Sequence, residues 1–226
     1  MSLSPQVLFQ EADYWLVSKP AGMSFHAESQ DQGFMQWVHQ NFPDQTFYPV
    51  HRLDRITSGL ILLAKNKAAA QIFGRMFEQH EVTKYYLALS AKKPKKKQGS
   101  IKGGMQQGRR GSWMLNKSDL NLAHTQFFSS TLKPGLRLFL LKPKTGKTHQ
   151  LRVALKSIGS SILGDQRYGG DPSDRGYLHA FYLSFVWKGE HKSYQYLPNT
   201  GSEFDGIESK LEQFAYHLPN DLAWPK

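Results

Sequence analysis

The stretch from His51 to Ala64 constrains the fold of this chain more than any other part of its sequence. It reads HRLDRITSGLILLA, and it places the carboxylate of Asp54 between the guanidinium groups of Arg52 and Arg55. A Thr-Ser-Gly turn follows, and then five consecutive apolar residues that are typical of a buried strand. We therefore expect the rest of the chain to be arranged around this strand and the charged residues that precede it.

The two arginines next to Asp54 favour the ionised form of its carboxylate, since a nearby cation stabilises the anion. A carboxylate kept anionic beside an apolar strand is suited to act as a nucleophile or base, or to stabilise positive charge at a sugar carbon. The alternative is a structural ion pair at a turn, which is common for such short motifs. The surrounding sequence has to decide between the two.

The composition indicates a folded soluble protein. The chain has 226 residues, of which 39% are hydrophobic and 13% aromatic, enough for a sizeable core. It has no cysteine, which excludes disulfides and thiolate metal sites and fits a reducing cytoplasm. The nine histidines show no metal-ligand spacing, and neither a signal peptide nor a membrane span of about 20 apolar residues is found. We expect a cytoplasmic monomer without a metal site.

Positive charge is concentrated in the middle of the chain. Residues 82–164 hold 17 of the 29 Lys and Arg residues and only one of the 18 acidic residues, Asp119. This span therefore carries a net charge of +16, and the remainder carries −5. Solubilising surfaces usually mix both signs, so the pattern favours a nucleic acid as the partner.

Hydrophobic periodicity predicts alternating strands and helices. Helices are expected over residues 33–41, over 67–80, from a cap at Thr148 onward, and near 209–216. The apolar face of the helix at 67–80 has Ala68, Ile72 and Met76 on one row and Ala69, Phe73 and Phe77 on the next. Strands are expected at 7–9, 13–18, 60–64, 82–90, 113–115, 125–128, 136–141 and 178–185. Residues 91–117 break this pattern and are expected to form a mobile basic loop or a weak hairpin.

Two basic segments contain candidate functional residues. In the strand at 82–90, Tyr86 shares a face with Lys84, whereas Tyr85 points the other way. In the helix that follows Thr148, the spacing places His149, Arg152 and Lys156 on one face. The preceding Gly-Lys-Thr resembles a phosphate loop, but the full Gly-x-x-x-x-Gly-Lys pattern is absent, so a nucleotide cofactor is not expected.

Six sequence blocks together resemble the RluA family of pseudouridine synthases. They are KPAG at 19–22, HRLDRITSGLILLAKN at 51–66, K-x-Y-x-A at 84–88, GKTHQLRV at 146–153, ILGDQRYG at 162–169 and LHA at 178–180. The resemblance covers roughly residues 7–190 and is strongest around Asp54. Two features depart from the family pattern: Ala154 stands where a His is usual, and no S4-type RNA-binding domain precedes the catalytic domain, because only 18 residues lie before Lys19.

The resemblance implies a single α+β catalytic domain over residues 1–226, with a core at about 7–190 and an acidic C-terminal extension at 191–226. Its fold would be a long, mostly antiparallel mixed sheet with packed helices and a central cleft that carries Asp54. The implied activity is a cofactor-free isomerisation of a uridine in tRNA or rRNA to pseudouridine. Base flipping is required, because C1′ is inaccessible in stacked RNA.

The resemblance also assigns roles to individual residues. Asp54 would attack C1′ or remove a proton from C2′, and Arg152 would pair with Asp54. Tyr86 would stack on the flipped base and assist proton removal from C5, and Arg52 would fill the space that the base leaves. The remaining candidate RNA contacts are basic residues near these blocks: Arg55, Lys84, Lys93, Lys95, Lys96, Lys97, Arg109, Arg110, His149 and Lys156.

Two alternatives to the isomerase remain open. A catalytically silent RNA-binding or RNA-remodelling protein could have the same fold, although an anion such as Asp54 would then stand where a polyanion must approach. A base-excising glycosidase would use the same carboxylate but release free uracil.

Overall fold

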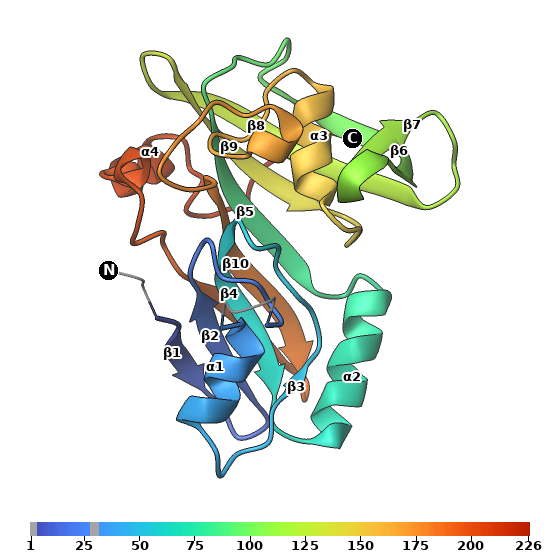
Figure 1. The fold of residues 1–226 in the computed structure, drawn as a ribbon, viewed down its shortest axis with the longest axis vertical. Coiled ribbons are helices and arrows are strands. Elements are labelled where there is room, and N and C mark those ends of the chain that lie inside the picture. The colour runs from blue at the N-terminus through green and yellow to red at the C-terminus, as the bar shows by residue number, and fades with distance from the viewer. Residues whose placement is uncertain (1–3, 28–31) are drawn as a thin grey trace. The chain divides into compact units, whose positions relative to one another are not determined.

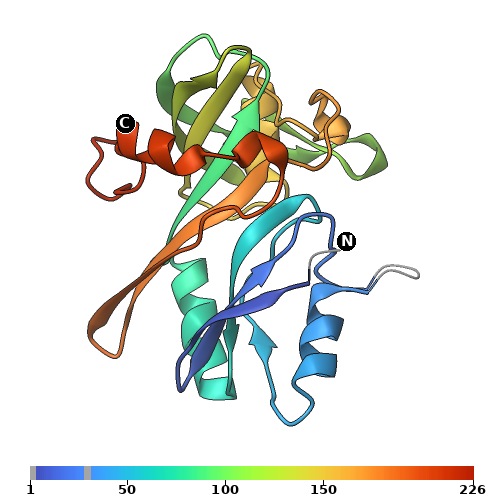
Figure 2. The same ribbon diagram turned by 90° about the vertical axis from the view of Figure 1, so that its left-hand side faces the viewer.

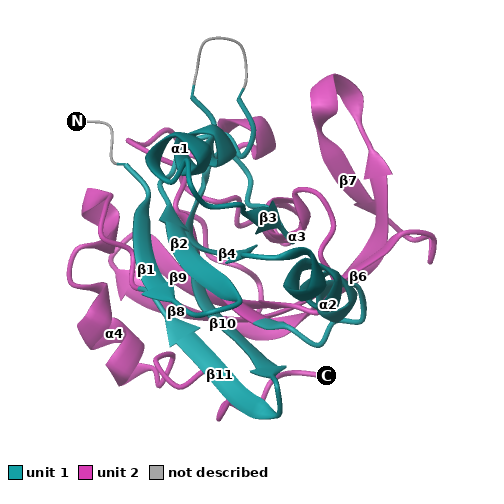
Figure 3. Ribbon diagram, turned by 90° about the horizontal axis from the view of Figure 1, so that it is seen from below, with its two compact units in different colours: residues 1–83, 180–196 teal, residues 84–179, 197–226 magenta. Residues whose placement is uncertain are grey.

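We describe a computed structural model of the chain, in which residues 4–27 and 32–226 are placed. Figure 1 shows the ribbon with its labelled helices and strands. The chain divides into two compact units, unit 1 with residues 1–83 and 180–196, and unit 2 with residues 84–179 and 197–226 (Figure 3). Within the described residues, no helix is long and apolar enough to cross a membrane.

Unit 1 is a sheet of mainly antiparallel strands with two helices. Its elements are β1 (Gln6–Gln10), β2 (Tyr14–Lys19), α1 (Phe34–Asn41), β3 (Tyr48–Pro49), β4 (Thr57–Ala64), α2 (Lys67–Glu78), most of β10 (Leu178–Trp187) and β11 (Glu190–Gln195). The central strand β4 is buried along its whole length, as predicted for the apolar run after Asp54. It pairs antiparallel with β2, and β10 lies on its other side.

Helix α2 packs on unit 1 through side chains from both predicted rows, since Ala69, Phe73 and Met76 are its buried residues. The side chain of Asn66 caps the helix by accepting a hydrogen bond from the Ala69 backbone N–H at 2.8 Å. Phe73 is fully buried and stacks on Trp187, with the ring centroids 4.3 Å apart. Ile72, predicted on a buried row, is 39% exposed, because it lies at the edge of the buried face rather than at its centre.

Unit 2 contains the remaining strands and the basic segment. Its elements are β5 (Thr83–Ser90, from Lys84 on), β6 (Gln98–Gln107), a 3-10 helix (Arg109–Gly111), β7 (Trp113–Asn116), β8 (Leu122–Lys133), β9 (Leu136–Pro143), α3 (Gln150–Ser157), two further 3-10 helices (Gln166–Tyr168 and Ser202–Phe204) and α4 (Ile207–Gln213). The strands pair antiparallel in the order β5-β9-β8-β6-β7. The predicted α+β class and the mostly antiparallel sheet are thus confirmed.

Within residues 91–117, strands β6 and β7 form a hairpin over residues 98–116. Strands β6 and β7 pair from Gly104 opposite Asn116 to Gln107 opposite Trp113. Of the two structures considered for this segment, the hairpin is correct. The lysines of residues 92–97 precede it, in the exposed connection between β5 and β6.

The two faces of the unit 2 sheet carry different partners. Helix α3 covers one face, where Leu151 and Leu155 pack against Phe139 and Leu141 of β9 (Figure 1). The C-terminal segment, red in Figure 2, packs on the opposite face. There the ring of Trp224 stacks on Tyr85 at 5.3 Å, so the acidic extension is part of the folded core of this unit.

Candidate active site

The loop that carries Asp54 is tied to the turn after β2 by reciprocal hydrogen bonds. The backbone N–H of Gly22 donates to the Arg55 carbonyl at 2.8 Å, and the Arg55 Nε donates back to the Gly22 carbonyl at 2.9 Å. The backbone N–H of Thr57 closes the turn by donating to the Asp54 carbonyl at 3.0 Å. Both partner segments belong to unit 1, so the KPAG and HRLDR blocks of the sequence form one local structure.

A buried lysine holds this turn from inside. Lys19 is only 1% exposed, and its ammonium group donates to the carbonyls of Pro20 at 2.9 Å, Met23 at 2.7 Å and Arg55 at 3.4 Å. A buried cation is tolerated only when its donors are satisfied, and three carbonyl oxygens satisfy all three. Lys19 therefore fixes the backbone on which Asp54 stands.

The other side of the Asp54 loop rests on His51. Its Nε2 accepts a hydrogen bond from the backbone N–H of Leu62 at 2.9 Å, and its ring stacks on Phe77 at 4.6 Å. Because Nε2 is an acceptor, His51 is the neutral tautomer that carries its proton on Nδ1. The imidazole thus links the loop to both strand β4 and helix α2.

The predicted Thr-Ser-Gly turn is wrong, because strand β4 already begins at Thr57 and the turn lies between Asp54 and Thr57. Gly59 is a strand residue with an unusual backbone. Its φ is +111°, and a Cβ at this position would lie 2.3 Å from the carbonyl oxygen of Ala180. Only glycine allows both the positive φ and the close approach of strand β10. The backbone of the TSG block at Gly59 is thus in direct contact with the backbone of the LHA block at Ala180.

In this frame Asp54 is half-buried, and Arg52 and Arg55 are exposed. The two arginines that flank the carboxylate in the sequence have different surroundings. The Arg55 Nε is engaged with the turn at Gly22, whereas the side chain of Arg52 extends into solvent. Arg52 is consequently accessible to a ligand that reaches Asp54.

Unit 2 presents Tyr86 and buries Tyr85, as alternation along β5 predicts. Tyr85 is fully buried, and its hydroxyl donates to the side-chain oxygen of Asn220 at 2.8 Å. Tyr86 is half-buried and packs at the edge of the cluster beneath α3. Lys84 lies two residues earlier on the same face, and burial lowers its pKa to about 8.

Arg152 makes a buried ion pair with Asp165, a residue to which the sequence analysis gave no role. Its Nε and Nη2 donate to the two carboxylate oxygens of Asp165 at 2.7 and 2.8 Å. The arginine and aspartate side chains are 6% and 2% exposed. A bidentate pair fixes the plane of the guanidinium group, so Asp165 positions Arg152. The predicted pairing of Arg152 with Asp54 stays a prediction.

The signal for Asp165 was present in the sequence. It is the first acidic residue after a span of 45 residues without one, and it lies in a block already singled out as ILGDQRYG. Gly164, in the same block, has a φ of +79°, and a Cβ there would lie 1.8 Å from the Arg175 carbonyl oxygen. The block thus forms a tight turn that delivers Asp165 to helix α3.

Helix α3 begins at Gln150, so the predicted cap at Thr148 is wrong. The preceding residue, His149, has a left-handed backbone with φ 57° and makes no side-chain cap. The amide of Gln150 satisfies the turn instead. It accepts from the Lys147 backbone N–H and the Thr145 hydroxyl, and donates to the His124 carbonyl and the Thr125 hydroxyl, at 2.7–3.0 Å. This anchoring sets the position of Arg152 two residues later.

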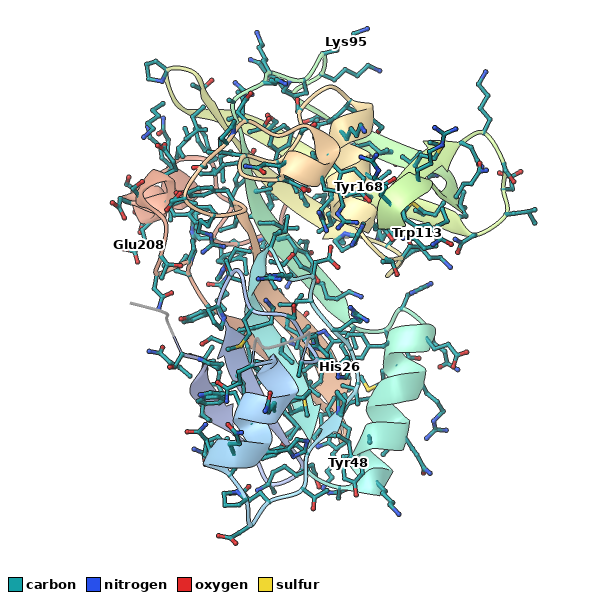
Figure 4. All side chains as sticks on the ribbon, viewed as in Figure 1. His26, Tyr48, Lys95, Trp113, Tyr168 and Glu208 are labelled. Carbon is teal, nitrogen blue, oxygen red and sulfur yellow. The ribbon has the colours of Figure 1, made fainter. Side chains whose placement is uncertain are left out.

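The face with His149, Arg152 and Lys156 converges on Tyr168, as the predicted shared face requires. Nδ1 of His149 is 2.8 Å from the buried hydroxyl of Tyr168. The Arg152 guanidinium and the Lys156 ammonium lie 4.9 and 5.6 Å from the centre of the tyrosine ring. Trp113 joins this cluster by donating its backbone N–H to the same hydroxyl at 2.9 Å (Figure 4).

The other basic candidates lie on exposed parts of unit 2. Arg109 and Arg110 are exposed in the short helix between β6 and β7, and the Arg110 carbonyl accepts a hydrogen bond from Arg167 at 2.9 Å. Figure 4 labels Lys95 of the lysine run, which is exposed in the connection between β5 and β6. Strand β5 continues for four residues after Tyr86 and ends at Ser90. At 3.3 Å per residue, the start of the lysine run is therefore about 13 Å or more along the chain from Tyr86.

A family model for RNA pseudouridylate synthase matches residues 13–157, which include the Asp54 loop, Tyr86 and Arg152. The chain belongs to this family. The resemblance to RluA-type enzymes is thereby confirmed, and so is the expected enzyme class, an RNA pseudouridine synthase and hence an isomerase.

Curated relatives support this membership along most of the chain. A protein of Haemophilus influenzae named "uncharacterized RNA pseudouridine synthase" is 46% identical over 198 residues, 87% of this chain and 88% of the relative. The tRNA pseudouridine synthase C of Haemophilus ducreyi is 32% identical and covers 72% and 73% of the two chains. The ribosomal large subunit pseudouridine synthase C of Rickettsia bellii is also 32% identical, over 73% of this chain and 57% of its own.

Solved structures of the family have the same fold. Human RNA pseudouridylate synthase domain containing 1 superposes with a TM-score of 0.79 at 26% identity, over 99% of this chain and 96% of the human one. Domain containing 4 gives a TM-score of 0.69 at 22% identity, over 92% of each chain, a likeness in fold alone.

Proposed function

We propose that this RNA pseudouridine synthase isomerises a specific uridine of a tRNA or rRNA, with Asp54 as its catalytic carboxylate. The observation that carries this proposal is the frame around the Asp54 loop. Three features fix the half-buried carboxylate of Asp54: the buried ammonium group of Lys19, the stacked neutral ring of His51, and Gly59, where no side chain fits. Such support is expected of a group that must meet a reacting atom with little error.

The chemistry assigned to Asp54 is the cleavage of the N1–C1′ bond of the target uridine. The carboxylate either attacks C1′ or removes the C2′ proton, and both routes detach uracil while it stays bound. The base then turns and rejoins through C5, which loses its proton as N1 gains one. An isomerisation of this kind needs no cofactor, because no electrons leave the substrate.

Two residues of unit 2 complete the proposed chemistry. The half-buried ring of Tyr86 stacks on the flipped uracil, and its hydroxyl assists the removal of the C5 proton. Arg152, held in plane by Asp165, pairs with Asp54 and orients its carboxylate toward the reacting carbon. Arg52, exposed beside Asp54, fills the gap that the flipped base leaves in the RNA.

The phosphates of the RNA are assigned to basic side chains around these groups. Their positive charge attracts the backbone without reading its sequence. The proposed contacts are Arg55, Lys84, Lys93, Lys95, Lys96, Lys97, Arg109, Arg110, His149 and Lys156. Since the relatives include a tRNA enzyme and a ribosomal enzyme, both substrate classes stay within the proposal.

A turnover assay on bulk uridine-containing RNA tests the reaction. We expect nucleoside analysis to find pseudouridine in place of uridine and no free uracil. Free uracil would indicate a base-excising glycosidase instead. Binding of RNA without any change in its nucleosides would indicate a silent RNA-binding protein on this fold.

The substrate itself can be found by comparing a strain that lacks this gene with its parent. Mapping pseudouridine across total RNA should reveal one or a few uridines that lose the modification in the deletion strain. Restoring the wild-type gene should restore those sites. A map identical to that of the parent would contradict the proposed substrate class.

A further inference from the structure

The face of the unit 2 sheet opposite helix α3 carries a compact group of basic side chains, which we call the back-face cluster: Lys102, His124, Lys142 and Lys144. Strand register places them together. Lys102 of β6 lies opposite His124 of β8, and Gln126, next on that face of β8, lies opposite Lys142 of β9. The backbone N–H of Lys144 then donates to the His124 carbonyl at 2.8 Å.

Alternation along the strands separates this cluster from the α3 face. Phe127 and Leu141, which neighbour Gln126 and Lys142 in sequence, pack under α3 with Tyr86 at their edge. The ammonium group of Lys142 instead lies 5.3 Å from the rings of both Tyr85 and Trp224, on the side of the C-terminal segment. The back-face cluster is therefore on the opposite side of the sheet from the proposed stacking tyrosine.

The charges in the cluster repel one another. Burial, and after it the positive charge of Lys144, lowers the pKa of Lys142 to about 8. Burial, and then the charges of Lys102 and Lys144, hold the pKa of His124 below its usual value. Among the described residues, no carboxylate lies within ion-pair distance of these four side chains. The His124 ring is hydrogen-bonded to the hydroxyl of Ser100, at 2.7 Å.

Three lysines elsewhere in the described residues, Lys133, Lys188 and Lys192, form ion pairs with acids. Lys188 lies 2.7 Å from a carboxylate oxygen of Asp13, and Lys192 lies 2.7 Å from one of Glu190. Within residues 4–27 and 32–226, the back-face cluster lacks such partners, although folding brings its positive charges together. An anion from outside the chain would remove the repulsion and use the donors of the lysines and of Ser100.

We propose that the back-face cluster binds a backbone phosphate of the RNA, at a second contact on the face of the sheet away from Tyr86. This inference rests on the proposed function, since it takes the polyanion to be the RNA substrate. It implies that a substrate long enough to reach this face binds more tightly than a short stem-loop that fills only the catalytic site. Both lysines at its rim, Lys102 and Lys144, are exposed and can reach such a strand.

The test is a double variant, Lys102→Gln with Lys144→Gln, compared with Lys188→Gln with Lys192→Gln. Both variants lose two charges, and the exposed position of Lys102 and Lys144 leaves the core intact. Binding of a long structured RNA is measured against salt concentration. We expect the back-face variant to lower the log–log salt slope by about 0.7, because one phosphate of a single strand is no longer neutralised. The acid-paired control should keep the slope of the wild type.

Three further readouts separate the possible outcomes. The single-turnover rate at saturating RNA should stay at the wild-type value, because the cluster is remote from Tyr86. NMR titration of His124 should show its pKa rising when RNA is bound, since a phosphate stabilises the imidazolium. A short stem-loop should bind both variants equally well.

Equal salt slopes for the two variants would overturn the inference. It would also be overturned if millimolar inorganic phosphate raised the pKa of His124 as much as RNA does, because the cluster would then be a site for free anions. The outcome does not depend on the chemistry of Asp54. Pseudouridine formation by the wild type, measured in parallel, reports on the proposed function alone.

Discussion

Replacing Asp165 with Asn tests the buried ion pair that positions Arg152. The amide keeps the volume of the carboxylate and one of its acceptors, but its NH2 group faces the guanidinium donors. One of the two hydrogen bonds, of 2.7 and 2.8 Å, is removed together with the negative charge. The Arg152 side chain, 6% exposed, then stays charged beside a neutral amide.

The expected loss of stability follows from the burial of both partners. Removing one member of a buried pair costs about 3–5 kcal/mol. The Tyr168 ring, 4.9 Å from the Arg152 guanidinium, and the remaining hydrogen bond favour the lower end of this range. We expect about 3 kcal/mol, which for a chain of this size lowers Tm by roughly 6–12 °C.

Urea unfolding followed by tryptophan fluorescence measures this loss, and a double-mutant cycle isolates the pair. The variant with both Arg152→Met and Asp165→Asn should lose less stability than the sum of the single losses, because it contains neither of the two buried charges. It should still be inactive, since Arg152 is absent. Additive losses, or a cost below about 0.5 kcal/mol for Asp165→Asn, would refute the positioning role.

Three other predictions follow from the geometry of the site. Gly59→Ala should destabilise the chain by more than about 3 kcal/mol in urea unfolding, because the added Cβ would clash with the backbone of Ala180 in strand β10. The control Gly135→Ala should cost only about 1 kcal/mol, because Gly135 has a φ of +75° but open space around the added Cβ. Tyr86→Phe should keep RNA affinity but slow single-turnover isomerisation at least about tenfold, with Tyr85→Phe at the normal rate; a normal rate for both would reduce Tyr86 to a stacking platform. Lys84, whose pKa is about 8, loses its charge as the pH rises through 8. RNA affinity should therefore fall more between pH 7 and pH 9 in the wild type than in the Lys84→Gln variant. An equal pH dependence of the two affinities would exclude a contact between Lys84 and the RNA.

The sequence predicted best those parts of the site that are contiguous in the chain. The buried strand β4 and the alternation of Tyr85 and Tyr86 depend on neighbours within a few residues. Local patterns are sufficient there, because strand periodicity is a property of short segments.

The interactions that the sequence did not predict depend on partners distant in the chain. Nothing near Arg152 indicates that Asp165 is its partner, because that choice depends on the turn that follows the helix. Threonine is a common N-cap residue, which is why Thr148 was predicted to cap the helix. The hydrogen bonds at the start of α3 are made instead by the side-chain amide of Gln150, which has four of them. The C-terminal segment lacks periodicity, yet it is anchored by the stacking of Trp224 on Tyr85.

Product analysis of Asp54→Asn tests the central assignment most directly. The amide preserves the volume of the side chain and removes the anion required at C1′ or C2′. With circular dichroism and RNA affinity unchanged, pseudouridine formation should fall below about a hundredth of the wild-type rate, a loss of more than roughly 2.7 kcal/mol in transition-state stabilisation. A folded Asp54→Asn protein that still forms pseudouridine above that level would contradict the assignment of Asp54 as the catalytic carboxylate.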